Sequence, residues 1–144
     1  MSNDTLPQPP PYGHKDATFQ AAGGETGIRA LVDSFYDLMS SKPEYQKIYN
    51  WHPDADSARD KLARFLCGWT GGPRRYHEKY GSINIPKVHA HLAISSVEKQ
   101  MWIDCMEEAL AAQPYDDQLK QYLLVQLAVP AEHVRKACKS QVER

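Results

Sequence analysis

The 144-residue chain is predicted to be an all-α protein on three observations. Apolar residues recur at intervals of three and four along several segments, which is the period of an amphipathic helix. No segment shows the alternation of apolar and polar residues that is typical of a strand, and no internal repeat is present. Glycine, proline and helix-capping residues separate the periodic segments. We assign residues 1–14, which contain four prolines, to a flexible tail and residues 15–144 to a single domain.

Two amphipathic helices are predicted in the first half of the chain. The first covers residues 25–41, with apolar side chains at positions 28, 31, 32, 35, 38 and 39. Pro43 then begins a short segment that ends at Tyr49, because proline is tolerated in the first turn of a helix. The second amphipathic helix covers residues 56–69, and the turn Gly71-Gly72-Pro73 ends it.

Residues 74–88 are mostly polar and are predicted to be irregular, with Gly81 and Pro86 as breakers. The uninterrupted connection over residues 70–94 is too long for an ordinary loop between helices. Long connections of this kind are usually functional, and we therefore expect the segment to surround a ligand.

Two further helices are predicted in the second half. Ser95 and Glu98 have the spacing of a capping box and open a helix that runs to about residue 112. Its inward stripe is predicted to contain Val97, Met101, Trp102, Cys105 and Ala109. After Pro114, Asp116 or Asp117 caps a last helix with apolar residues at positions 119, 123, 127 and 134. Pro130 lies inside that helix and is predicted to kink or split it.

The composition excludes several classes of protein. The 17 basic and 18 acidic residues give a net charge of −1, which offers no electrostatic attraction to nucleic acid or to an anionic membrane. No apolar run approaches the ~20 residues that span a bilayer, and the first residues do not resemble a signal peptide. Three cysteines without a CxxC spacing do not indicate a disulfide scaffold. We therefore expect a cytoplasmic protein.

Familiar catalytic motifs are missing from the sequence. It contains no His-Glu-x-x-His zinc motif, no Gly-x-Ser-x-Gly nucleophile elbow and no glycine-rich phosphate loop. The remaining candidates for a ligand-binding site are a histidine, either His89 or His91, and two aromatic hydrogen-bond donors, Tyr36 and Trp102. His89 and His91 are two residues apart, so on a helix they point roughly 200° from each other and at most one faces a pocket. Tyr36 and Trp102 are either core aromatics or polar groups that face a ligand. Spacing alone leaves both choices open.

Several segments together resemble the group II truncated haemoglobins, over about residues 20–137. The resemblance is carried by Phe35-Tyr36, by the Gly-Gly-Pro-x-x-Tyr element that ends at Tyr76, by His89-Ala90, and by Trp102, thirteen residues after His89. It implies a two-over-two helical sandwich that encloses haem b, the iron complex of protoporphyrin IX. A neutral imidazole then supplies one axial ligand of the iron, and donors on the opposite face bind a diatomic ligand.

The resemblance also implies a role for individual residues. His89 is the expected iron ligand, and Tyr36, Tyr49 and Trp102 are the expected hydrogen-bonding partners of the diatomic ligand. The other expected haem contacts are Ala58, Leu62, Phe65, Tyr76, Arg74 and Lys87, with Arg75 as a further partner for the propionates. Val88 stands where many relatives have an arginine, so the choice among these propionate partners stays open. The loop before Asp54 is one residue longer than in some relatives, which would let His52 reach the haem, and His91 is a competing iron ligand.

The function expected from this resemblance is reversible binding of O2 at ferrous iron, with CO, NO and peroxide as further ligands. A redox enzyme that converts NO to nitrate or turns over peroxide would use the same residues, and the sequence does not separate the two. Such an enzyme would need a separate reductase, because the chain has no flavin or nicotinamide motif. A helical interaction module without haem is the third alternative. Monomer and homodimer both stay open.

Overall fold

The computed structural model describes residues 12–143, which contain helices and no strand, as predicted. The helices in chain order are α1 (Ala17–Ala21), α2 (Gly24–Ser41), η2 (Pro43–Tyr45), α3 (Gln46–Tyr49), α4 (Ala55–Trp69), α5 (Arg75–Tyr80), α6 (Ile85–His89), α7 (Ser96–Ala111), α8 (Asp117–Ala137) and α9 (Lys139–Val142). None of the described helices has the length and apolar content that crossing a membrane requires.

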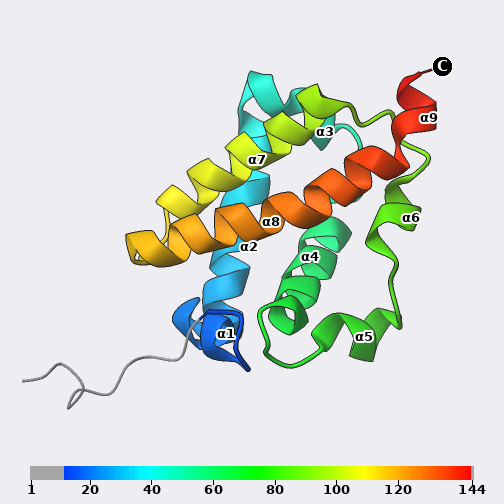
Figure 1. Cartoon of the computed structure of the whole chain (residues 1–144). Coiled ribbons are helices and arrows are strands. Elements are labelled where there is room, and N and C mark those ends of the chain that lie inside the picture. The colour runs from blue at the N-terminus through cyan, green and yellow to red at the C-terminus, as the bar shows by residue number, and fades with distance from the viewer. Residues whose placement is uncertain (1–11, 144) are drawn as a thin grey trace, which may run out of the picture.

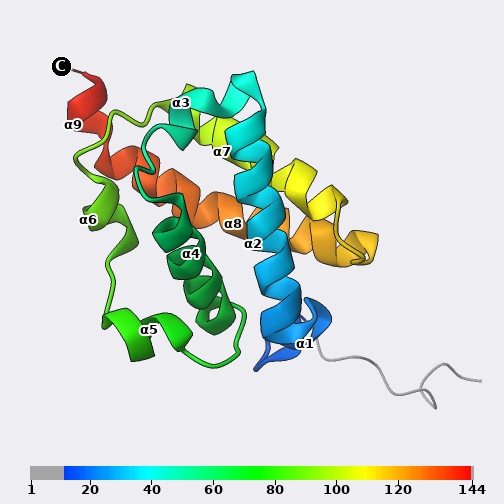
Figure 2. The ribbon, with the colours of Figure 1, turned by 180° about the vertical axis from the view of Figure 1, so that it is seen from behind.

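The four long helices form two crossed pairs. Helix α2 packs on α4, and α7 packs on α8, while contacts between α2 and α7 join the two pairs. In Figure 1 the α7–α8 pair lies in front of α2 and α4, and the view from behind in Figure 2 reverses the order. This arrangement confirms the predicted two-over-two sandwich. The short helices α5 and α6 run down one side of it, and α6 packs on α8.

Side-chain caps set the start of three of the long helices. The Asp54 carboxylate accepts the backbone N–H three residues on at 3.1 Å and opens α4. Ser95 and Glu98 form the predicted capping box at the start of α7. Asp116, rather than Asp117, caps α8 by accepting a backbone N–H at 2.7 Å. Local sequence signals therefore determine where these helices begin.

The structure differs from the prediction along residues 74–88, which are not irregular but contain α5 and most of α6. Neither helix has a buried residue, so neither carries the apolar stripe that would have indicated a helix. Helix α1 was missed as well, since five residues are too few to show a period. The expectation that residues 70–94 form a purely irregular segment is therefore wrong.

Two details of the last helices also differ. Helix α8 continues through Pro130, so the alternative in which proline splits it is wrong. The carbonyl that loses its partner there belongs to Gln126, which is exposed, and water can bind it. In α7, Val97 is 59% exposed and does not belong to the inward stripe, whereas Cys105 and Ala109 are fully buried.

The Gly-Gly pair after α4 is explained by the N-terminal helix that lies against it. A Cβ atom on Gly72 would stand 2.4 Å from the ring of Phe19. Gly71 has a φ of +95°, and a Cβ there would stand 1.9 Å from the carbonyl oxygen of Lys15. The Phe19 N–H donates to the Thr70 carbonyl at 3.1 Å. These contacts require glycine at both positions.

Tyr12, in the predicted tail, contacts the last long helix. The rings of Tyr12 and Tyr122 meet at a tilt with their centroids 5.1 Å apart, and the Tyr12 hydroxyl lies 3.4 Å from a carboxylate oxygen of Asp116. The rest of the predicted tail, residues 1–11, lies outside the described residues. All three cysteines are buried and unpaired, in agreement with the absence of a disulfide scaffold.

Candidate functional site

A largely apolar cavity of about 460 Å³ lies between α4, α6, α7 and α8. Its volume is in the range of pockets that hold a cofactor or a drug-sized ligand. The apolar side chains on its wall come from both helix pairs and from the segment around α6, and include Ile48, Ala58, Leu62, Phe65, Leu66, Ile83, Ile85, Val88, Leu92, Ile94, Leu127 and Val134. The long connection that was expected to surround a ligand therefore forms part of the cavity wall.

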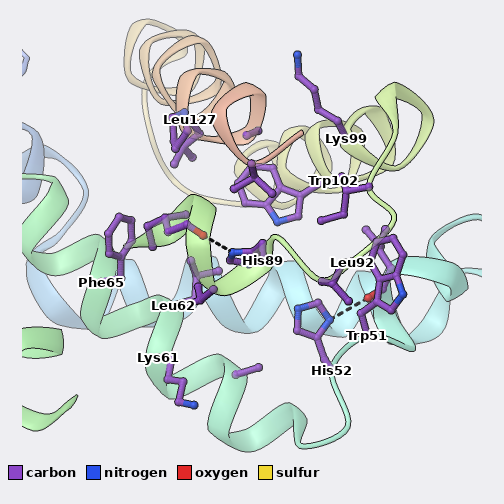
Figure 3. A pocket seen from close by; sticks show the side chains of 18 of the residues that line it. Trp51, His52, Lys61, Leu62, Phe65, His89, Leu92, Lys99, Trp102 and Leu127 are labelled. Carbon is purple, nitrogen blue, oxygen red and sulfur yellow. Dashed lines mark hydrogen bonds between the residues drawn. The ribbon is translucent and has the colours of Figure 1, made fainter. Parts of the chain in front are cut away.

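His89 is the last residue of α6, and its ring lies on the cavity wall near Trp102 (Figure 3). Its Nδ1 atom lies 2.7 Å from the carbonyl oxygen of Ile85. A carbonyl only accepts hydrogen bonds, so Nδ1 carries the proton and donates it. In a neutral ring held this way, Nε2 is the nitrogen that keeps the lone pair, which is the arrangement found in most metal-binding histidines.

The short helix that carries His89 forms because of two local features. Asn84 caps it by accepting the backbone N–H of Lys87 at 3.1 Å, and Pro86 occupies its first turn. His91 follows α6 and also borders the cavity, but it is exposed and makes no hydrogen bond to a described residue. The geometry therefore favours His89 over His91 as a ligand-binding imidazole.

Two aromatic donors, Tyr36 and Trp102, also line the cavity. Tyr36 on α2 is 4% exposed, and Phe35 contacts both its ring and the Trp102 ring edge to face, at centroid distances of 5.3 and 5.2 Å. Neither the Tyr36 hydroxyl nor the Trp102 indole N–H donates a hydrogen bond to any residue from 12 to 143. The described residues contain no buried side-chain donor without a partner, so these two groups are open to the cavity and available to a ligand there.

The environment keeps the Tyr36 hydroxyl protonated. Burial raises the pKa of Tyr36 far above its ordinary value, and the nearby Arg59 opposes the shift only in part. The Arg59 guanidinium lies 5.8 Å from the centre of the Tyr36 ring and is itself bound by Asp33 and Asp37. Tyr36 is therefore a neutral donor over the whole physiological pH range.

His52 occupies the wall position for which the sequence suggested Tyr49. The His52 ring meets Tyr36 edge to face at 5.4 Å, and its Nδ1 atom donates to the Ile48 carbonyl at 2.9 Å. Tyr49 does not border the cavity and packs against the core. The longer loop before Asp54 was the only signal for His52. Burial lowers the pKa of His52, so its ring is held in the neutral form.

The predicted cationic partners are distributed differently from the expectation. Lys87 is exposed and does not border the cavity, and Arg74 instead lines a second groove of about 340 Å³. Tyr76 borders both hollows. Lys61 and Lys99 border the main cavity, although the sequence did not single them out. Lys61 follows Ala58 by three positions on α4, so the two lie on the same side of the helix. This spacing was the signal that could have identified Lys61 as a residue of the cavity wall.

The cavity fits a haem group. Its wall is mostly apolar, and it is lined by an imidazole whose Nδ1 atom is hydrogen-bonded and by two donors without a partner among residues 12–143. Residues 12–143 contain no group of three His, Cys, Asp or Glu side chains that could hold a metal ion by themselves. A metal that a macrocycle already holds needs only an axial ligand from the protein, and His89 is a residue that could provide it.

A two-over-two helical fold around such a cavity defines a truncated globin, and comparison with known proteins agrees. The model of the bacterial-like globin family matches residues 17–136, and the chain belongs to this family. The resemblance to group II truncated haemoglobins is confirmed, and family membership implies a haem cofactor.

Individual relatives give the same result. The chain is 27% identical over 119 residues to the group 2 truncated hemoglobin YjbI of Bacillus subtilis, covering 83% of this chain and 88% of that protein. It is similar to the cold-adapted truncated hemoglobin of Pseudoalteromonas haloplanktis (TM-score 0.78, 29% identity, 81% and 95% of the two chains). It is also similar to the truncated oxygen-avid haemoglobin of Bacillus subtilis (TM-score 0.73, 26% identity, 81% and 97%).

Proposed function

We propose that this globin holds haem b through His89 and binds O2 reversibly, with Tyr36 and Trp102 donating hydrogen bonds to the ligand. The observation that carries the proposal is the pairing of two features in one cavity. The Nδ1–H group of His89 donates a hydrogen bond to the Ile85 carbonyl, which leaves Nε2 of the neutral ring as the atom that can bind iron. Tyr36 and Trp102 line the same cavity, and their donor groups make no hydrogen bond to any residue from 12 to 143.

The haem would supply a ferrous iron that takes up and releases diatomic ligands. The protein's part is to orient and to exclude water. The Ile85 carbonyl fixes the rotation of the His89 ring, so Nε2 stays directed at one point. Apolar side chains of α4, among them Leu62 and Phe65, keep the cavity dry, and a hydrogen bond from a buried donor is stronger in such surroundings.

Tyr36 and Trp102 would then slow the release of the ligand. The charge that develops on a bound diatomic ligand is negative, and a neutral O–H or N–H donor stabilises it. The Phe35 ring lies between the two and contacts both, so their positions are fixed relative to each other. A relative from Bacillus subtilis is described as oxygen-avid, which supports tight binding of O2 as the function of the same fold.

The ultraviolet–visible spectrum of the haem-reconstituted protein tests the proposal. Spectra of the ferric, dithionite-reduced and CO-treated forms are compared for the wild type, His89→Ala and the matched control His91→Ala. We expect a Soret band that shifts with CO in the wild type and in His91→Ala, and a lost or strongly altered band in His89→Ala. A pyridine haemochrome assay identifies the haem type. A normal spectrum in His89→Ala would contradict the ligand assignment.

A further inference from the structure

The backbone carbonyl of His89 is held from the far end of the chain. It accepts a hydrogen bond from the thiol of Cys138 at 3.1 Å, forty-nine residues away in sequence, and a second from the Leu92 N–H at 3.0 Å. Cys138 is fully buried, with an exposed fraction of 0%. The residue expected to bind iron is therefore anchored on its main chain by a side chain that lies outside the cavity wall.

Helix α6 is held by its packing on α8 and by the Asn84 cap at its start. It contains five residues, none of them buried, and the segments on either side of it are not helical. Its last carbonyls, like those of every helix, have no partner within the helix. A thiol that binds the carbonyl of the last residue supplies such a partner. The orientation of the His89 ring then depends on an anchor that comes from another helix.

That anchor is itself rigid. Cys138 caps the end of α8, and its N–H lies 3.1 Å from the carbonyl oxygens of Val134 and Arg135. Val134, one turn earlier, borders the cavity, and α8 also packs on α6, so the same helix contacts both. Cysteine suits this position because it packs as a small apolar side chain and still carries a weak S–H donor.

We propose that Cys138 is a positioning residue for His89. Its thiol fixes the main chain at the end of α6 and thereby keeps Nε2 of the imidazole directed into the cavity. This inference rests on the proposed function, because His89 must be the iron ligand for its orientation to matter. It adds the residue that caps the end of α8 to a site whose other residues border the cavity.

The test measures the bond between iron and imidazole in the haem-reconstituted ferrous protein. Resonance Raman spectroscopy gives the iron–histidine stretching band, and transfer of haem to excess apomyoglobin gives the rate of haem loss. Cys138→Ala removes the donor, and Cys138→Ser keeps one. Cys105→Ala is the matched control, because Cys105 is also fully buried and its thiol also donates to a main-chain carbonyl, that of Phe35 at 3.4 Å, away from α6.

We expect Cys138→Ala to shift or broaden the iron–histidine band and to speed haem loss roughly two- to fivefold, as suits one weak neutral hydrogen bond. Cys138→Ser should return both values most of the way to the wild type, and Cys105→Ala should leave the band unchanged. A wild-type band in Cys138→Ala, or an equal shift in Cys138→Ser, overturns the proposal. If Cys138→Ala does not fold, Cys138→Val, which fills the volume without a donor, replaces it under the same criterion.

Failure of the proposed function would look different. If the wild type shows no iron–histidine band, or if His89→Ala keeps it, the assignment of the iron ligand is wrong. If the band is present in the wild type, lost in His89→Ala and unmoved by every change at Cys138, only the positioning role is wrong.

Discussion

Removing the Tyr36 hydroxyl alone should weaken the retention of O2 without disturbing the fold. Tyr36→Phe deletes one oxygen atom and keeps the ring, so the edge-to-face contacts with Phe35 and His52 persist. The hydroxyl makes no hydrogen bond to a described residue, so the substitution leaves no protein acceptor without its donor. Any change in ligand release then reports the interaction between the hydroxyl and the ligand.

The magnitude follows from the burial of the donor. Tyr36 is 4% exposed, and a hydrogen bond from such a donor to a partly negative ligand contributes about 1 to 2 kcal/mol. That energy corresponds to roughly a 5- to 30-fold faster release of O2. Trp102→Phe should act in the same direction. Because both donors address one ligand, the effect of the double variant should differ from the sum of the two free energies.

Stopped-flow displacement of O2 by CO measures the dissociation rate. Tyr45→Phe is the control, since the Tyr45 side chain is buried like that of Tyr36 but its hydroxyl donates to Glu108 at 3.1 Å, away from the cavity. We expect a wild-type rate in Tyr45→Phe. Wild-type rates in both Tyr36→Phe and Trp102→Phe would refute the assignment of these residues as donors to the ligand.

Three further outcomes concern stability and are measured by urea unfolding. Gly72→Ala should lower the free energy of unfolding by about 1 to 3 kcal/mol, because the new methyl group overlaps the packed ring of Phe19; an unchanged midpoint would mean that this ring moves freely. Ser95→Ala should cost about 1 kcal/mol through loss of the capping box at α7, and a loss below a few tenths would contradict the cap. Hydrogen bonds from Lys79 and the Tyr80 hydroxyl, with Arg29 and Arg64, hold the pKa of Asp60 well below its usual range. The stability that this carboxylate contributes is therefore present above pH ~4 and is lost as the pH falls below that value, so Asp60→Asn should be less stable near pH 7 and should lose less stability on acidification. An equal acid dependence in both proteins would contradict this reasoning.

Periodicity and caps were sufficient to predict the long helices. The stripe over residues 25–41 and the capping box at Ser95 depend on neighbouring residues alone, and both are present in the structure. Helices α5 and α6 were missed because they bury no residue, so their position depends on the helices that they lie against and not on a pattern of their own.

The cavity was predictable in part for the same reason. Tyr36 and Trp102 lie on helices whose phase the sequence determines, whereas His89 was identified from the family resemblance, because Pro86 was taken as a helix breaker. The loop that contains Tyr49 and His52 has no period, and only tertiary contacts decide which of the two rings borders the cavity. The bond from Cys138 to the His89 carbonyl joins two distant segments through a main-chain atom, and no side-chain pattern marks it.

The burial of all three cysteines has a practical consequence for solution studies of this globin. Their exposed fractions are 3% for Cys67 and 0% for Cys105 and Cys138, so thiol reagents cannot reach them without local or global opening of the fold. The rate of reaction with such a reagent would therefore report opening at three separate places: α4, α7 and the end of α8. A single cysteine introduced on the surface could be labelled with a fluorophore or a spin label while the native thiols stay in place.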